Sequence, residues 1–193
     1  MARLRDARWS IYIENQYLES SKIIARLDDA LGRGIEVVAV VPAEPDGASF
    51  SAPRARLARY ENFTMAGIAG LDVRGTRTPV YVHDKLMLVD DEWATVGSCN
   101  LHKYSFFGNS ELNVAFTDAD AARAMRVELL KEYLATETSH IDDRAALRLF
   151  REIAMQNRAR WDRGVCAWQG LAFRLDVERY GSRTGDDRIG NAT

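Results

Sequence analysis

Hydrophobic and polar positions along the chain predict repeated switches between strand and helix. Residues 9–13 are aromatic and β-branched, and residues 35–41 form a continuous apolar run typical of a buried strand. The apolar positions between them recur at helical spacing and are Ile23, Ile24, Leu27 and Leu31. Ser20 or Ser21 precedes them and can cap the helix. This strand–helix–strand unit predicts two parallel strands joined by a right-handed crossover.

The same patterns predict shorter elements along the rest of the chain. The expected elements are a loop over residues 42–53, a helix from Pro53 with Leu57, Tyr60 and Met65 inward, strands at 71–74, 80–89, 93–96 and 111–116, a turn at 90–92, a loop at 101–108, helices at 118–134 and 142–161, and an extended segment within 165–180. We therefore predict an α/β fold with a mixed, mostly parallel sheet flanked by helices on both faces.

Composition limits the classes of protein that the chain can belong to. Its 193 residues are 47% hydrophobic, enough for the core of one domain. The net charge of −2 and the isoelectric point near 6.0 argue against a generic nucleic-acid-binding surface. Cys99 and Cys166 form no disulfide framework or metal-ligand spacing. No apolar run is long enough for a transmembrane segment, and we expect no signal peptide in residues 1–10. The cellular compartment stays undetermined.

The densest chemistry lies between residues 81 and 113. The pattern HxKxxxxDxxxxxxGSxN is filled without a gap by His83, Lys85, Asp90, Gly97, Ser98 and Asn100. A chance match to it is on the order of 10⁻⁸ per start site. If residues 80–89 form one strand, His83 and Lys85 project from the same face, because side chains alternate along a strand. An imidazole and an ammonium placed in this way can meet one phosphate.

Phosphodiester cleavage needs a nucleophile, a proton donor for the leaving oxygen, and positive or donor groups for the phosphoryl oxygens. His83 can fill either of the first two roles. Lys85 supplies charge, and Asn100 supplies an amide donor. Ser98 and Glu111 are candidates to fix the tautomer of the histidine, since a ring nitrogen attacks only when it is unprotonated.

Other residues near the motif receive structural or weaker assignments. We interpret Asp90 as a turn-stabilising residue and Gly97 as a position where a side chain would obstruct a close approach. His102 and His140 have no matching lysine after them, so a structural role is favoured for both. Candidate substrate contacts are Gln16, Tyr17 and His102.

The pattern resembles the HKD motif of the phospholipase D superfamily, with Glu111 in the place of the family's histidine-orienting acid. The phrase IYIENQYLES resembles the opening strand of the C-terminal catalytic lobe in phosphatidylcholine-type phospholipases D. The resemblance implies a phosphodiesterase that hydrolyses or exchanges the head group of a phospholipid at a membrane surface through histidine-based phosphoryl transfer. By that resemblance His83 is the general acid. No metal or cofactor is implied.

The chain carries one such motif, whereas the larger members of the superfamily have two lobes with one motif each. We expect residues 1–138 to form a phospholipase D-like catalytic lobe, residues 139–180 a C-terminal helical extension packed on it, and residues 181–193 a flexible tail. The expected partner is a second catalytic lobe or a second copy of the chain. Tyr17, Phe106 and Phe107 are candidates to line that interface, and the two phenylalanines can instead contact an acyl chain or join the core.

Two alternatives to the phospholipid-active enzyme stay open. One is a homodimeric single-motif endonuclease, in which nucleic acid is the substrate. The other is a non-catalytic lobe that binds phosphate or lipid. The intact set of His83, Lys85 and Asn100 argues against a decayed site.

Overall fold

The computed structural model describes residues 2–45 and 51–181. The strands are β1 Ser10–Asn15, β2 Glu36–Val40, β3 Phe63–Leu71, β4 Arg77–Val80, β5 Lys85–Val89, β6 Trp93–Gly97, β7 Asn113–Thr117 and β8 Ala172–Arg174. The helices are α1 Ala2–Asp6, α2 Ser21–Gly32, α3 Ala52–Ala55, the 3₁₀ helix η1 Arg56–Arg59, α4 Lys103–Phe107, α5 Ala119–Leu134 and α6 Asp143–Trp161. Most of the predicted flexible tail, and part of the predicted loop at 42–53, lie outside the described residues.

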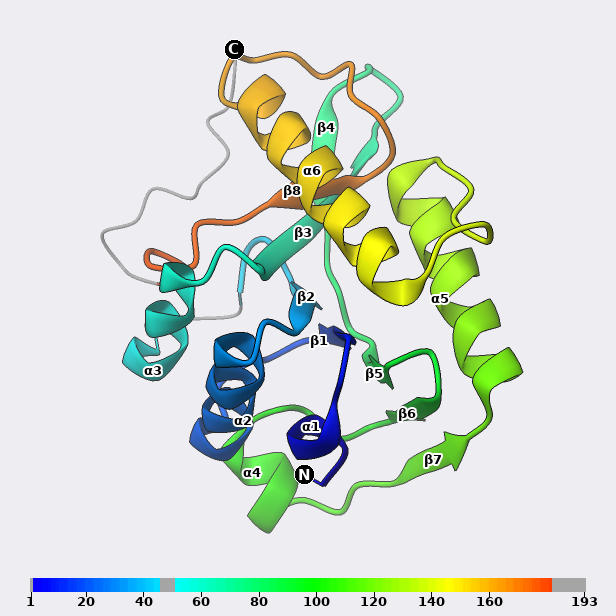
Figure 1. The fold of residues 1–193 in the computed structure, drawn as a ribbon. Helices are drawn as coiled ribbons and strands as arrows, with labels where there is room; N and C mark the ends of the chain where they lie inside the picture. The colour runs from blue at the N-terminus through cyan, green and yellow to red at the C-terminus, as the bar shows by residue number, and fades with distance from the viewer. Residues whose placement is uncertain (1, 46–50, 182–193) are drawn as a thin grey trace.

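The strands form one eight-stranded sheet with helices on both faces, as predicted (Figure 1). The order is β4-β3-β2-β1-β5-β6-β7, and β8 pairs with β3. The predicted parallel pairing of β1 with β2 is confirmed. The expectation of a mostly parallel sheet is wrong: within the described residues β1–β2 and β2–β3 pair in parallel, and the other five strand pairings are antiparallel. The connections after β3 and β5 are short, residues 72–76 and 90–92, and leave no room for crossover helices, so the strands that they join are antiparallel.

Alternation along the central strands divides the core between the two faces of the sheet. Ile11, Ile13 and Met87 belong to a buried cluster that includes the apolar side of α2. Tyr12 and Leu88 belong to a second cluster, on the face covered by α5 and α6. The strands are buried on both sides, which explains the nearly unbroken apolar run of β2.

The helix expected from Pro53 is shorter than predicted, and Met65 lies in a strand instead. Ser51 caps α3 by accepting a hydrogen bond from the backbone N–H of Arg54, and Leu57 is buried as predicted. The chain then enters β3. A Cβ on Gly67 would lie only 2.9 Å from the Cβ of Ala43, so the strand depends on the missing side chain. Pairing with β2 and β8 overrides a composition of Gly, Ala and Met that does not favour strands.

The strand predicted over residues 80–89 is broken by an irregular segment, 81–84. Ala66 pairs with Val40 on one side and with β8 on the other, while Ile68 pairs with β8 and with Val80. Therefore β4 lies on the same side of β3 as β2, beyond the end of β2. Residues 81–84 cross the carboxyl ends of β2 and β1 to reach β5. His83 lies in this crossover, outside any strand.

The later helices begin where the sequence predicts. Asp118 and Asp142 cap α5 and α6 by accepting hydrogen bonds from Ala121 N at 3.0 Å and Ala145 N at 2.7 Å. Ser20 occupies the N-cap position of α2 but makes no side-chain cap hydrogen bond. The segment expected as a loop at 101–108 contains the short helix α4. In the C-terminal part, α6 packs on β1 and β2, and β8 joins the sheet.

Candidate active site

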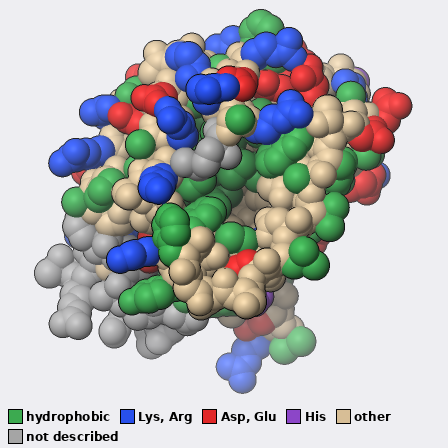
Figure 2. Space-filling model, turned by 90° about the horizontal axis from the view of Figure 1, so that it is seen from below, with side chains coloured by type: hydrophobic (Ala, Val, Ile, Leu, Met, Phe, Trp, Pro, Cys, Tyr) green, Lys and Arg blue, Asp and Glu red, His purple; other side chains and the backbone are tan. Residues whose placement is uncertain are grey.

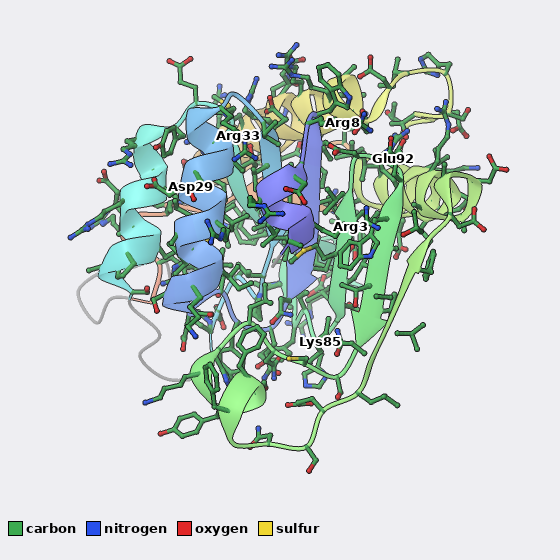
Figure 3. All side chains as sticks on the ribbon, turned by 60° about the horizontal axis from the view of Figure 1, so that its bottom comes forward. Arg3, Arg8, Asp29, Arg33, Lys85 and Glu92 are labelled. Carbon is green, nitrogen blue, oxygen red and sulfur yellow. The ribbon has the colours of Figure 1, made fainter. Side chains whose placement is uncertain are left out.

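The motif residues other than Asp90 lie towards the edge of the sheet where the parallel strands β1 and β2 end. Lys85 begins β5 opposite Asn15, the last residue of β1. Gly97 ends β6 opposite Asn113, the first residue of β7. Figure 3 shows Lys85 at the end of the sheet near α4. Ligands in open α/β sheets bind outside the carboxyl ends of strands, so this edge is the expected place for a site.

Lys85 is buried at this edge, with 8% of its surface exposed. Its Nζ donates to the backbone oxygen of His83 at 2.6 Å and to Oε1 of Gln16 at 3.3 Å. Burial lowers the pKa of Lys85, and the charges of Asp84 and Glu111 oppose that shift. A poorly solvated ammonium interacts more strongly with a neighbouring anion than a fully hydrated one does.

His83 is exposed in the crossover. Its ring stacks against that of Tyr81, with the ring centroids 6.3 Å apart. Within residues 2–45 and 51–181, no side chain or backbone group forms a hydrogen bond with the imidazole. The crossover therefore fixes the backbone of His83 next to Lys85 and leaves both ring nitrogens open to a ligand.

Glu111 holds the segment after β6 against α4. Its two carboxylate oxygens accept hydrogen bonds from Ser98 Oγ at 2.6 Å and Ser105 Oγ at 2.7 Å. These two hydroxyl donors lower the pKa of Glu111. The backbone N–H of Leu112 donates to Ser98 Oγ at 3.1 Å. We expected a hydrogen bond from Glu111 or Ser98 to the imidazole of His83. Among the described residues, Glu111 and Ser98 instead bond to each other and to Ser105 and Leu112.

Asn15 is a residue at this edge that the sequence analysis did not single out. Its side chain is 2% exposed, and its Oδ1 accepts hydrogen bonds from the backbone N–H groups of Tyr17 and Leu101, both at 3.0 Å. Its Nδ2 donates to the carbonyl of Cys99 at 3.4 Å. Asn15 therefore fixes the segment that carries Asn100. The signal for it was the phrase IYIENQY, in which two polar residues, Glu14 and Asn15, end a strand of aromatic and β-branched residues.

Gly97 permits a close approach, and the groups that approach it are Leu112 and Asn113 at the start of β7. A Cβ at this position would lie 2.2 Å from the carbonyl oxygen of Leu112 and 2.4 Å from Oδ1 of Asn113. That same Oδ1 accepts a hydrogen bond from Cys99 N at 3.1 Å. A side chain at Gly97 would push β7 away and disturb the backbone next to Ser98.

Asp90 lies at the opposite end of β5, remote from Lys85. Its carboxylate accepts hydrogen bonds from the backbone N–H groups of Arg8, Trp9 and Ser10, at 2.9, 2.8 and 3.0 Å. Its φ of 56° is in the left-handed region, where Asp and Asn are tolerated better than most residues. These contacts tie the start of β1 to the residue after β5, and the structural role of Asp90 stays a prediction.

The three weaker candidates lie near the motif, in different settings. Gln16 contacts Lys85 through Oε1 and donates from Nε2 to the hydroxyl of Tyr81 at 2.8 Å. The ring of Tyr17 lies 4.9 Å from that of His102, measured between centroids. His102 Nδ1 accepts a hydrogen bond from Ser105 N and so caps α4. His102 therefore has a structural contact, while Gln16 lies next to the motif lysine.

Asn100 and Cys99 differ in what they offer to a ligand. The Oδ1 of Asn100 is buried without a hydrogen-bond partner among the described residues, so this oxygen can accept a bond from a further donor. Burial raises the pKa of the Cys99 thiol, which disfavours the thiolate needed for a nucleophile. In the part of the chain that the structure describes, no three or more His, Cys, Asp or Glu side chains are placed to hold a metal ion.

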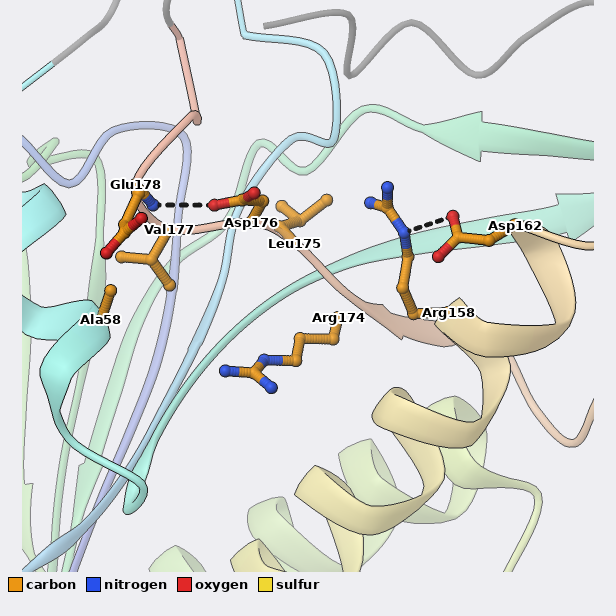
Figure 4. Close-up of a pocket in the computed structure, with 8 residues that line it drawn as sticks. All are labelled: Ala58, Arg158, Asp162, Arg174, Leu175, Asp176, Val177 and Glu178. Atoms are coloured by element: carbon orange, nitrogen blue, oxygen red, sulfur yellow. Dashed lines mark hydrogen bonds and ion pairs between the residues drawn. The ribbon is translucent and has the colours of Figure 1, made fainter.

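Two hollows lie outside the motif itself. One of about 340 Å³ adjoins it and is lined by Pro42, Ala43, Glu44, Pro45, Pro79, Val80 and Tyr81. Another of about 430 Å³ is lined by Ala58, Arg158, Asp162, Arg174, Leu175, Asp176, Val177 and Glu178 (Figure 4). Neither of these two hollows is lined by a predicted site residue. None of the described helices is both long and apolar enough to cross a bilayer.

The family described as "Cardiolipin synthase, PLD-like domain" matches residues 1–133 of this chain. The chain belongs to the phospholipase D superfamily. This confirms the resemblance carried by His83, Lys85 and the GSxN segment. The phospholipase D superfamily is one of phosphodiesterases, so the edge at Lys85 is a candidate phosphodiesterase site.

Curated members of the superfamily align with most of the chain. It is 30% identical over 135 residues to the probable cardiolipin synthase YwiE of Bacillus subtilis, covering 69% of this chain and 26% of that protein. It is 31% identical over 141 residues to cardiolipin synthase B of Escherichia coli K12, covering 72% and 32%. The aligned part thus spans about a quarter to a third of these relatives.

A solved structure has a similar fold. NucT from Helicobacter pylori superposes with a TM-score of 0.56 at 20% sequence identity, covering 67% of this chain and 82% of that one. At this identity the likeness concerns the fold alone. It agrees with the mixed sheet flanked by helices described above.

Proposed function

We propose that the chain is a phospholipase D-type catalytic lobe that cleaves or exchanges the head group of a phospholipid. The observation that carries this proposal is the buried Lys85 ammonium, which donates to the backbone oxygen of the exposed His83 at the edge of the sheet where Asn15 holds the residues on either side of Asn100. The names of the curated relatives favour a phospholipid over other phosphodiesters as substrate.

In this proposal the phosphoryl group lies against Lys85 and Asn100. The ammonium offsets the charge on the non-bridging oxygens, and the Asn100 amide donates a hydrogen bond to one of them. His83 holds a proton on the nitrogen that faces the leaving alcohol and transfers it as the P–O bond breaks. Glu111 acts indirectly, because its bonds to Ser98 and Ser105 hold the segment that carries Asn100.

The reaction also needs a nucleophile on the opposite side of phosphorus, since displacement occurs in line. One imidazole cannot occupy both sides. We propose that a second motif supplies it, from a second copy of this chain or from a second lobe. Its histidine nitrogen would form a bond to phosphorus as the alcohol departs, and water or another alcohol would then displace that nitrogen.

The test is a panel of substrates offered to the purified chain, whose mass in solution is measured in parallel. We expect head-group release from phosphatidylglycerol or phosphatidylcholine vesicles, its loss in Lys85→Met, and its retention in His140→Ala, a control at an exposed histidine outside the motif. Cleavage of DNA without turnover of lipid would replace the proposal with a nuclease. Binding of lipid without turnover by any assembly would make this a non-catalytic lobe.

A further inference from the structure

Helix α4 turns three aromatic side chains outward. Tyr104, Phe106 and Phe107, here called the aromatic cluster, are 71%, 40% and 69% exposed. The rings of Phe106 and Phe107 lie 6.3 Å apart between centroids. Exposed aromatic rings of this size are unfavourable in water, and contiguous ones mark a binding surface. The structure thereby excludes the core role that the sequence left open for the two phenylalanines.

Lysines flank the aromatic cluster. The ammonium of Lys22, in α2, lies 5.0 Å from the centroid of the Phe107 ring. Lys103 begins α4 and is exposed. Across the residues that the structure describes, neither ammonium takes part in an ion pair. Aromatic rings bordered by unpaired lysines are typical of surfaces that sit in the interface of a bilayer with anionic head groups.

The opposite side of α4 is fixed to the candidate active site. Ser105 is 5% exposed and donates to Glu111, while His102 caps the helix. The five residues of α4 therefore present aromatic rings to the outside and the hydroxyl of Ser105 to Glu111. On the face of the molecule seen from below in Figure 2, on the side where α4 lies in Figure 1, hydrophobic side chains gather around a hollow.

We infer that the aromatic cluster, with Lys22 and Lys103, docks on the surface of an anionic phospholipid bilayer. The rings enter the boundary between head groups and acyl chains, and the lysines pair with lipid phosphates. Docking holds the edge with Lys85 and His83 at the height of the lipid phosphodiesters. The inference rests on the proposed function for its substrate, but binding to vesicles does not require turnover. The other possible occupant of the surface is a second copy of the chain.

Vesicle co-sedimentation of the whole chain tests the inference. The probes are vesicles of phosphatidylcholine alone and of phosphatidylcholine mixed with phosphatidylglycerol. The variant Tyr104→Ser/Phe107→Ser removes two exposed rings, and we expect it to weaken partition to mixed vesicles at least tenfold. The matched control is Leu71→Ser/Val73→Ser, which removes two exposed apolar side chains, 58% and 104% exposed, at the end of β3 and in the turn after it. It should bind as the parent chain does.

A second variant tests the charges. Lys22→Ala/Lys103→Ala should weaken binding to mixed vesicles several-fold and leave little of the preference over phosphatidylcholine alone. Equal vesicle binding by the ring variant and the parent chain would overturn the inference. So would a fall in solution mass caused by the ring variant, because the cluster would then cover a second copy. Absence of turnover with intact, ring-dependent binding would instead count against the proposed function only.

Discussion

The two ends of β5 hold residues of one motif in opposite surroundings. At one end Lys85 is buried beside the exposed ring of His83, and the Oδ1 of Asn100 lacks a partner among the described residues. At the other end Asp90 accepts three backbone hydrogen bonds, and the neighbouring Asp91 pairs with Arg126, which is 1% exposed. Figure 3 shows this separation, with Lys85 at one end and the paired Arg8 and Glu92 at the other.

A single motif thus combines two tasks. Open hydrogen-bonding groups at the Lys85 end are available to a ligand, whereas the saturated groups at the Asp90 end stabilise the chain itself. Substitutions at the two ends should therefore separate turnover from stability.

His83→Ala should abolish turnover and leave stability almost unchanged. Positioned acid–base groups contribute about 10²- to 10⁴-fold, so we expect a loss of ~10³-fold in kcat. The ring is exposed and is not hydrogen-bonded to any described residue, so the thermal midpoint should move by less than about 2 °C. A head-group release assay measures kcat, and calorimetry measures the thermal midpoint. A large fall in the midpoint would mean that His83 also supports the fold.

Asp90→Ala should show the reverse behaviour. Three backbone N–H groups lose their acceptor, and alanine is strained at a φ of 56°, so unfolding should become easier by about 3 kcal/mol. Asp90→Asn keeps one acceptor oxygen and tolerates the backbone, and should lose roughly half as much. Urea unfolding gives these values. Turnover per folded molecule, measured well below the midpoint, should stay within twofold; a larger loss would place Asp90 in the reaction.

Glu14 is a buried carboxylate next to Asn15 in the chain, and its side chain lies on the other face of the sheet. It is 1% exposed and accepts hydrogen bonds from the hydroxyls of Tyr12 at 2.6 Å and Tyr133 at 2.9 Å. Burial raises its pKa from 4.5 to about 7, more than the two hydroxyls lower it. The folded chain therefore holds this proton more tightly than the unfolded chain does.

The sign of the pH dependence follows from that difference. The contribution of Glu14 is fully present below pH 4.5 and is lost as the pH rises to about 7, because the folded chain then binds more protons than the unfolded one. The shift corresponds to ~3 kcal/mol. Unfolding free energies at pH 5 and pH 8 should differ less in Glu14→Gln than in the parent chain. An identical difference in both chains would contradict the raised pKa.

Glu111→Gln should give the smallest of these effects. The amide keeps the shape but replaces one acceptor oxygen, so one of the bonds from Ser98 and Ser105 is weakened. We expect kcat to fall about tenfold, as for other residues that orient catalytic groups. Glu128→Gln, at an exposed position of α5, is the control. Full turnover in Glu111→Gln would mean that Glu111 connects the two loops and has no effect on the reaction.

Strong local signals made parts of the fold and site predictable. The apolar runs predicted β1 and β2, and Asp118 and Asp142 predicted the starts of α5 and α6. The motif predicted which residues between His83 and Asn100 belong to the candidate site. The sequence could not reveal that residues 81–84 form a crossover, because an alternating Val-Tyr-Val-His phrase is also typical of a strand. Nor could it reveal β3, whose Gly67 is required by neighbours distant in the chain. Asn15 escaped because its partners lie on the loop after β6.

The crossover has a consequence for the order of folding. β1 must pair with β5, and the Asp90 carboxylate bonds to Trp9 across 81 residues of chain. Contacts of such long sequence separation form slowly, since the entropy of closing the loop is lost before they are made. The hairpin of β5 and β6 is local and can form early. We therefore expect residues 81–84 to order only when β5 docks on β1, so that the lysine and histidine come together in one of the last steps of folding.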